Sequence, residues 1–143
     1  MKKSSNYIKL EFLSRSTNEG FARSALSAFA AQADPTLDEL ADVKTAVSEA
    51  VTNCIVHAYA NTIGPITLTA ALYEDGTLRV AVADKGCGIP DVSKAMEPLF
   101  TTGGAERAGL GFAVMESFMD SVKVRSAPGK GTRVTLSKRL GTR

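Results

Sequence analysis

The segment from residue 84 to residue 88 contains residues that could recognise a flat purine base. It reads Asp84-Lys-Gly-Cys-Gly88 and directly follows an alternating, strand-like segment at 78–83. A carboxylate can accept a hydrogen bond from an exocyclic amine, and glycines would let the backbone approach the ring closely. This chemistry suits adenine. The same string also suits a tight turn in which Gly86 and Gly88 supply positive φ angles, so both interpretations stay open.

A second pair of glycines could bind phosphate. Gly109, Leu110 and Gly111 stand immediately before the helix that we expect at 112–119, and Arg107 lies just upstream. Backbone amides at a helix N-terminus bind anions, and a guanidinium forms bidentate hydrogen bonds with phosphate. A lone Gly-x-Gly is also common in ordinary loops. The chain contains neither the Walker spacing nor a full Gly-x-Gly-x-x-Gly, which disfavours the P-loop and dinucleotide folds.

Three polar residues recur at intervals of four in a segment with helical periodicity. Glu49, Asn53 and His57 therefore share one face of the expected helix, rotated away from the apolar stripe that runs from Leu40 to Ala58. This polar ridge could face a ligand. It could equally be a solvated face on which a Glu–Asn pair adds a few tenths of a kcal/mol.

The periodicity of the first sixty residues predicts one strand and two helices. Alternation predicts a strand at 7–12. The two helices are expected to begin at Ser16 and at Thr36, because each of these residues is followed three positions later by a glutamate, the spacing of a capping box. The second helix, with its long apolar stripe, is the clearest element in the sequence.

The remainder of the chain predicts a sheet interrupted by a long loop. Alternation at 66–72 and 78–82 around Glu74-Asp-Gly76 indicates a β-hairpin. Regular periodicity then stops between residues 84 and 111, a length typical of functional loops. A helix at 112–119, an extended segment at 122–124 and a last strand that carries Val134 and Leu136 follow. Gly131-Thr132 begins that last strand.

This order of elements predicts the fold class. The strands are grouped too unevenly for a doubly wound sheet, which favours helices packed on one face of a mixed, mostly antiparallel sheet. We therefore expect an α/β two-layer sandwich. A length of 143 residues suits one domain, spanning 1–143.

Composition narrows the function classes. Apolar residues make up 44% and charged residues 22% of the chain, as in folded soluble proteins. We expect a cytoplasmic protein without a membrane segment, because no apolar run approaches the length of a bilayer span. A net charge of +2 with scattered basic residues argues against direct binding of nucleic acid. The spacing of Cys54 and Cys87 fits free thiols.

Taken in order, these segments resemble a known superfamily. The order begins with a helix that carries Glu49 and Asn53, followed by a strand that ends in Asp84 and two glycines. A long loop comes next, then a Gly-x-Gly that opens a helix, and finally a Gly-Thr that begins a strand. This order resembles the GHKL ATP-binding domain shared by gyrase, histidine kinases and MutL. The resemblance covers nearly the whole chain and implies the Bergerat fold, with ATP or ADP and Mg²⁺ as cofactors.

Three longer strings resemble one branch of that superfamily more closely. They are Ser48-Glu-Ala-Val-Thr-Asn53, Pro98-Leu-Phe-Thr-Thr102 and Gly111-Phe-Ala-Val-Met-Glu-Ser-Phe-Met-Asp120, which are similar to the anti-sigma F factors of endospore-forming bacteria. That resemblance implies a serine protein kinase. It also implies that the chain sequesters a sporulation sigma factor as a homodimer and releases it to an anti-anti-sigma protein whose serine it phosphorylates.

The resemblance also implies roles for individual residues. Glu49 would be the catalytic base that accepts a proton from the serine hydroxyl, and Asn53 would be a ligand of Mg²⁺. Asp84 would bind the adenine amine. Arg23, on the exposed side of the first helix, would contact the sigma factor, although a solvated arginine is the simpler interpretation. The other expected nucleotide-binding residues are Gly86, Gly88, Thr101, Thr102, Arg107, Gly109, Leu110, Gly111 and Thr132.

Three alternatives remain within this interpretation. The chain could be a nucleotide-gated sigma-binding module that transfers no phosphate. It could be a simple ATP hydrolase that shares the pocket. It could also be an anti-sigma kinase of the general stress type. A sensor histidine kinase is disfavoured, because His57 is the only histidine and lies on the expected nucleotide helix.

Overall fold

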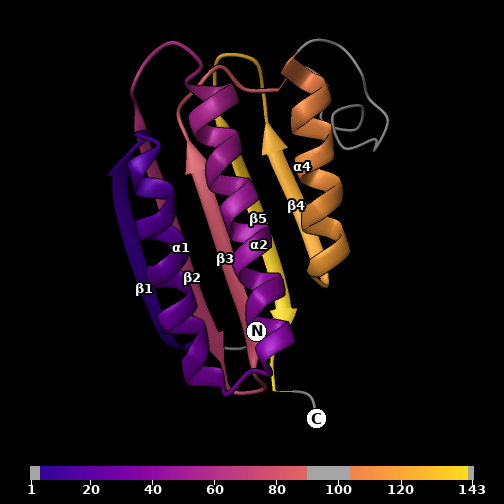
Figure 1. Cartoon of the computed structure of the whole chain (residues 1–143). Coiled ribbons are helices and arrows are strands. Elements are labelled where there is room, and N and C mark those ends of the chain that lie inside the picture. The colour runs from indigo at the N-terminus through magenta and orange to yellow at the C-terminus, as the bar shows by residue number, and fades with distance from the viewer. Residues whose placement is uncertain (1–3, 90–103, 142–143) are drawn as a thin grey trace.

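The described residues fold into two layers, with three α-helices on one face of a five-stranded sheet (Figure 1). The computed structural model describes the backbone of residues 4–89 and 104–141, and the side chains of 4–89 and 111–141. The strands are β1 (Ser4–Leu13), β2 (Pro65–Tyr73), β3 (Thr77–Asp84), β4 (Ser121–Ser126) and β5 (Thr132–Arg139). The helices are α1 (Thr17–Ala30), α2 (Leu37–Asn53) and α4 (Gly104–Phe118), with short segments η1 (Ala31–Ala33) and η2 (Cys54–Ala58).

The sheet has the order β1-β2-β3-β5-β4, and each neighbouring pair is antiparallel. The expected two-layer α/β sandwich is therefore confirmed, and the described strands contain no parallel pair. Strand β3 lies at the centre. Its last residue, Asp84, is opposite Ile66 on β2 and Thr132 on β5, so a carboxylate ends the central strand between two neighbours.

The core lies between the sheet and the helices. On β2 the buried residues alternate with partly exposed ones, as the sequence predicts for a sheet with one covered face. Apolar side chains from α1, α2 and α4 complete this core. Its largest fully buried side chains include Leu26, Val47, Leu68, Phe112 and Leu136.

The two predicted capping boxes have different outcomes. Thr36 accepts a hydrogen bond from the Glu39 amide, and the Glu39 carboxylate accepts one from the Thr36 amide, so the second box is confirmed. The first is wrong. Ser16 has helical backbone angles, unlike a typical N-cap, and its side chain makes no cap. The Glu19 carboxylate, which would form the other half of the box, is engaged by Ser48 and Arg23.

Two helix boundaries also differ from the expectation. The last five residues of the predicted second helix, Cys54–Ala58, form a π-helix, a distortion that is frequent at functional sites. Helix α4 begins at Gly104, so Gly109 to Gly111 lie inside it and do not precede it. The segment 105–108 reads Ala-Glu-Arg-Ala, and such residues favour the helix strongly enough to extend it upstream.

Among the described residues, no helix is long and apolar enough to cross a membrane.

The capping box gives a stability prediction with an internal control. Thr36→Ala removes the side-chain acceptor for the Glu39 amide and should lower the free energy of unfolding by about 1 kcal/mol. Ser16→Ala should change it much less, because Ser16 makes no side-chain cap. Urea unfolding followed by circular dichroism measures both. Equal losses in the two variants would contradict this account of the helix starts.

Candidate functional site

A small pocket opens where α2 passes into η2. Its walls come from four parts of the chain that are far apart in the sequence: the end of α2, the end of β3, the start of β5 and the described part of α4. The lining includes Asn53, Cys54, Asp84, Gly88, Phe112 and Thr132. The structure thus brings the predicted acid-Asn helix and the predicted base-binding loop to one place.

Asp84 organises the floor of this pocket. Its side chain is buried, with 8% of its surface exposed, and Oδ1 accepts hydrogen bonds from the amides of Gly86 (2.9 Å) and Thr132 (3.2 Å). A buried carboxylate must be compensated by donors, and these two amides supply them. Asp84 therefore fixes the loop after β3 and the start of β5 relative to each other.

The loop from residue 85 to residue 89 needs its glycines for close packing. A Cβ on Gly86 would lie 2.5 Å from the carbonyl oxygen of Ala58 at the end of η2. Gly88 has a φ of +77°, and a Cβ there would overlap the carbonyl oxygen of Ala127. Only glycine meets both demands without strain. The turn interpretation is confirmed for Gly88, which has the positive φ, but it is wrong for Gly86, which does not have a positive φ and is required by its close approach to Ala58. Recognition of adenine by this loop stays a prediction.

Ser126 ties together the segments on the far side of the pocket. Its hydroxyl accepts from the Ile89 amide (2.8 Å), donates to the Gly131 carbonyl (2.9 Å) and lies 2.8 Å from the Thr132 hydroxyl. The sequence analysis missed this residue. A serine at the end of a short strand carries no signal of its own, and its partners become visible only when β4 and β5 pair.

Burial also shapes the chemistry of two side chains near Asp84. Desolvation, helped by the charge of Asp84 and a hydrogen bond to it, raises the pKa of the Cys54 thiol well above its ordinary value. Cys54 is therefore a neutral, unreactive thiol at physiological pH. Burial likewise raises the pKa of Tyr59, whose hydroxyl accepts from the Lys85 amide (2.7 Å) and donates to the Pro65 carbonyl (2.8 Å).

At the other end of the pocket, Glu49 and Asn53 face α4. A Cβ on Gly111 would lie 3.1 Å from Asn53 Nδ2 and 3.3 Å from Glu49 Oε2, so the glycine lets α4 pack directly against both side chains. Asn53 Nδ2 is buried and has no hydrogen-bond partner among the described residues. An orphaned amide at this depth is costly, and a polar ligand would compensate it.

The described residues contain no cluster of three or more His, Cys, Asp or Glu side chains that could hold a metal by themselves. A Mg²⁺ ion that is bound together with phosphates typically takes one or two protein oxygens and completes its shell with water and phosphate. The side-chain oxygen of Asn53 is of the right type, and Glu49 adds negative charge beside it.

The remaining predicted residues have separate outcomes. Gly109, Leu110 and Arg107 lie on α4 by their backbone, and the helical position of Gly109 to Gly111 corrects the expectation that they precede the helix. Thr101 and Thr102 lie outside the described residues.

Arg23 lies on α1, where its guanidinium is 3.3 Å from Glu19 and 43% of its side chain is exposed. Glu19 also accepts from Ser48, the neighbour of Glu49 on α2.

The family of this chain follows from its sequence and agrees with the fold. The profile described as "Histidine kinase-like ATPase domain" matches residues 12–138. The chain therefore belongs to the family of histidine kinase-like ATPase domains.

Within that family, the chain is similar to proteins named anti-sigma F factor. One from Caldanaerobacter subterraneus subsp. tengcongensis is 58% identical over 137 residues, which is 95% of each chain. Another, from Clostridium acetobutylicum, is 52% identical over 136 residues, or 94% of each chain. The resemblance inferred from the three strings is thereby confirmed.

Solved structures support the same fold. The structure of the RsbU and RsbW domains of a Mycobacterium tuberculosis protein aligns with 95% of this chain and 32% of its own, at 25% identity and a TM-score of 0.70. Full-length ShkA in complex with AMPPNP aligns with 73% of this chain and 22% of its own, at 24% identity and a TM-score of 0.57. At that identity, the second likeness shows the fold alone.

The hydrogen bonds of Ser126 can be tested by deletion. Ser126→Ala leaves the Ile89 amide without its acceptor and should lower the free energy of unfolding by about 1–3 kcal/mol. Ser117→Ala is the matched control, because that exposed hydroxyl bonds only to a carbonyl of its own helix. Chemical unfolding measures both variants. If Ser126→Ala were as mild as the control, Ser126 would not hold the pocket together.

Proposed function

We propose that this chain is an anti-sigma factor that binds ATP and phosphorylates a serine of an anti-anti-sigma protein. The observation that carries the proposal is the convergence of Asp84, Asn53 and Glu49 on one site, in a chain of the histidine kinase-like ATPase family. The names of its relatives supply the anti-sigma role. Such a function would be exercised in the cytoplasm, on a sporulation sigma factor.

Asp84 would recognise adenine. Oδ1 is already engaged by two backbone amides, so the other carboxylate oxygen would accept a hydrogen bond from the exocyclic amine. Gly86 and Gly88 would leave room for the flat ring, and Thr132 would lie beside it. The same carboxylate would therefore both shape the loop and bind the base.

The phosphates would lie toward Asn53 and Glu49. Asn53 would hold Mg²⁺, which when bound neutralises charge on the phosphates and helps to orient them. Glu49 would accept the proton of the incoming serine hydroxyl. Positioning and charge neutralisation would supply most of the rate, as is general for phosphoryl transfer.

Nucleotide binding would also require a change in α4. The amides of Gly109, Leu110 and Gly111 lie beyond the first turn of α4, where backbone amides bond to carbonyls of their own helix. For these amides to hold phosphates, the first turns of α4 would unwind. The helix-forming residues 105–108 are flanked by glycines at 104, 109 and 111, each of which lowers the stability of this part of α4. Arg107, Thr101 and Thr102 would also bind the nucleotide.

Two surfaces of the N-terminal elements would bind protein partners. Arg23 would contact the sigma factor from the exposed side of α1. Among the described strands, β1 lies at the edge of the sheet and pairs with β2 alone, so its other edge would be available for a homodimer. The hydrogen bonds of Glu19 with Arg23 and Ser48 would connect the sigma contact to the helix that carries Glu49.

The adenine assignment predicts the effect of Asp84→Asn. The amide oxygen of Asn can still accept from Gly86 and Thr132, but its NH₂ group cannot accept from an adenine amine. Affinity for ATP should therefore fall roughly tenfold or more, as for loss of a hydrogen bond to a charged group. Isothermal calorimetry measures this. Asp120→Asn, distant on the α4–β4 turn, is the control, and unchanged affinity in Asp84→Asn would refute the assignment.

The kinase assignment predicts the effect of Glu49→Gln. The amide keeps the shape of the side chain but cannot accept the serine proton, so phosphate transfer should fall about a hundredfold or more while ATP binding is retained. Intact-mass analysis of an anti-anti-sigma protein from the same organism, after incubation with Mg·ATP, measures the transfer. Glu116→Gln, an exposed change on α4, should transfer phosphate normally.

Two outcomes would contradict the kinase assignment. If the unmodified chain binds ATP but adds no phosphate to the partner, the chain is a nucleotide-gated binding module. If it turns ATP over equally well without any protein acceptor, it is a simple hydrolase. Full transfer by Glu49→Gln would leave the kinase in place but remove Glu49 as its base.

A further inference from the structure

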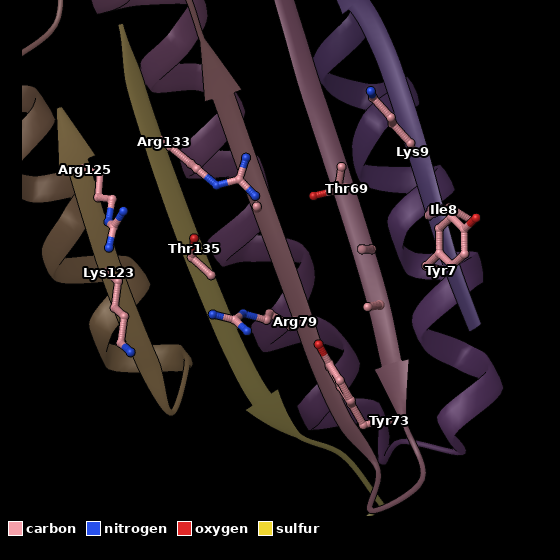
Figure 2. A pocket seen from close by; sticks show the side chains of 13 residues that line it. Tyr7, Ile8, Lys9, Thr69, Tyr73, Arg79, Lys123, Arg125, Arg133 and Thr135 are labelled. Carbon is pink, nitrogen blue, oxygen red and sulfur yellow. The ribbon is translucent and has the colours of Figure 1, made fainter. Parts of the chain in front are cut away.

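The face of the sheet that the helices leave uncovered carries a cluster of cations. Lys9, Arg79, Lys123, Arg125 and Arg133 come from four strands and are all exposed (Figure 2). They surround a hollow of about 630 Å³. We call this surface the open face.

Charges are segregated on the open face. Because side chains alternate along β1, Glu11 lies on the open face together with Tyr7 and Lys9. Glu11 is the one carboxylate that the five described strands carry on this face. Two ion pairs of the described residues, Arg23–Glu19 and Lys138–Asp42, do not involve these five cations. A chain with a net charge of only +2 thus gathers five exposed cations on one surface, whose strands carry a single carboxylate.

Two of these cations are direct cross-strand neighbours. Arg125 on β4 is opposite Arg133 on β5, and both side chains are exposed on the same face. Like charges directly opposite each other destabilise a sheet. An anionic group placed over this pair would convert a repulsion into two charge-assisted hydrogen-bonded contacts.

The centre of the open face has room for a ligand. The hollow is floored by small side chains, including Thr69, Ala71, Ala81 and Thr135. Tyr7, of which 73% is exposed, rises at the β1 side, and Tyr73 lies near the end of β2 (Figure 2). Tyrosine and arginine are the residue types that most often dominate protein-binding surfaces.

We propose that the open face binds an acidic, extended segment of a partner protein. Five strands spaced about 4.8 Å apart give a face roughly 20 Å wide, which about six or seven residues of extended chain would cross. Glutamate or aspartate side chains would meet the cations, and the peptide backbone would lie over the small side chains. This binding site goes beyond the proposed kinase activity, whose residues lie on the helix side of the sheet.

Two other occupants fit less well. A second copy of the chain would bring the same cations against themselves across a symmetric contact. A nucleic-acid-binding domain usually has a pI above about 9, whereas this chain has a pI of 8.6. Charge complementarity therefore favours an acidic protein.

The test uses a fluorescein-labelled oligoglutamate peptide of about seven residues, with binding to the full chain measured by fluorescence anisotropy at low salt. The variant Arg79→Gln with Lys123→Gln removes two cations that border the hollow. Affinity should fall roughly tenfold, as for the loss of two exposed ion pairs. The matched control, Arg15→Gln with Lys44→Gln, removes two exposed cations outside the open face and should bind normally.

Several results would overturn the proposal. One is no binding of the peptide by the unmodified chain, and another is an equal loss in both double variants. Binding that does not weaken as salt is added would also contradict an ionic contact. If an oligothymidylate of similar length binds more tightly than the peptide, the open face is a nucleic-acid surface. Thermal unfolding confirms that each variant is folded, and ATP binding should be the same in both.

Discussion

The candidate site depends on one buried carboxylate. Asp84 ends the central strand of the sheet, and its Oδ1 atom accepts the amides of Gly86 and Thr132. These bonds join the loop after β3 to the start of β5, although the two segments are nearly fifty residues apart. A buried charge without hydrogen-bond donors is costly, so moving either amide away from the carboxylate would cost free energy. The pocket wall is thus fixed before any ligand arrives.

Other contacts in the pocket extend this arrangement. Ser126 connects the loop at Ile89 to Gly131 and Thr132, and Tyr59 connects Lys85 to the start of β2. The π-helical segment after α2 widens the helix where Ala58 meets Gly86. In contrast, Asn53 keeps a buried amide without a partner in the described structure. The pocket thus has one end that is fixed by hydrogen bonds, at Asp84, and one end with an unsatisfied amide, at Asn53, which suits a site that is completed by a polar ligand.

The sheet separates two kinds of surface. Its covered face packs against α1, α2 and α4, and the candidate site lies where α2 and α4 meet the ends of β3 and β5. Its open face is exposed and basic (Figure 2). Because side chains alternate along each strand, a single strand such as β5 contributes both to the core, through Val134 and Leu136, and to the open face, through Arg133 and Thr135. The alternation of side chains along each strand therefore determines which residues lie on each surface.

The sequence by itself determined the element types, the two-layer class and most of the residues around the pocket. These follow from local patterns: alternation marked the hairpin, helical spacing marked Glu49 and Asn53, and glycines marked the loop after Asp84. The sequence-based prediction failed at the start of the first helix. Ser16 and Glu19 have the spacing of a capping box, but the Glu19 carboxylate binds Ser48 and Arg23 instead. Only the tertiary structure decided the Ser126 contacts, the early start of α4 and the gathering of cations on one face. Each depends on which strands and helices become neighbours, and that information is carried by packing of the whole chain and not by any short segment.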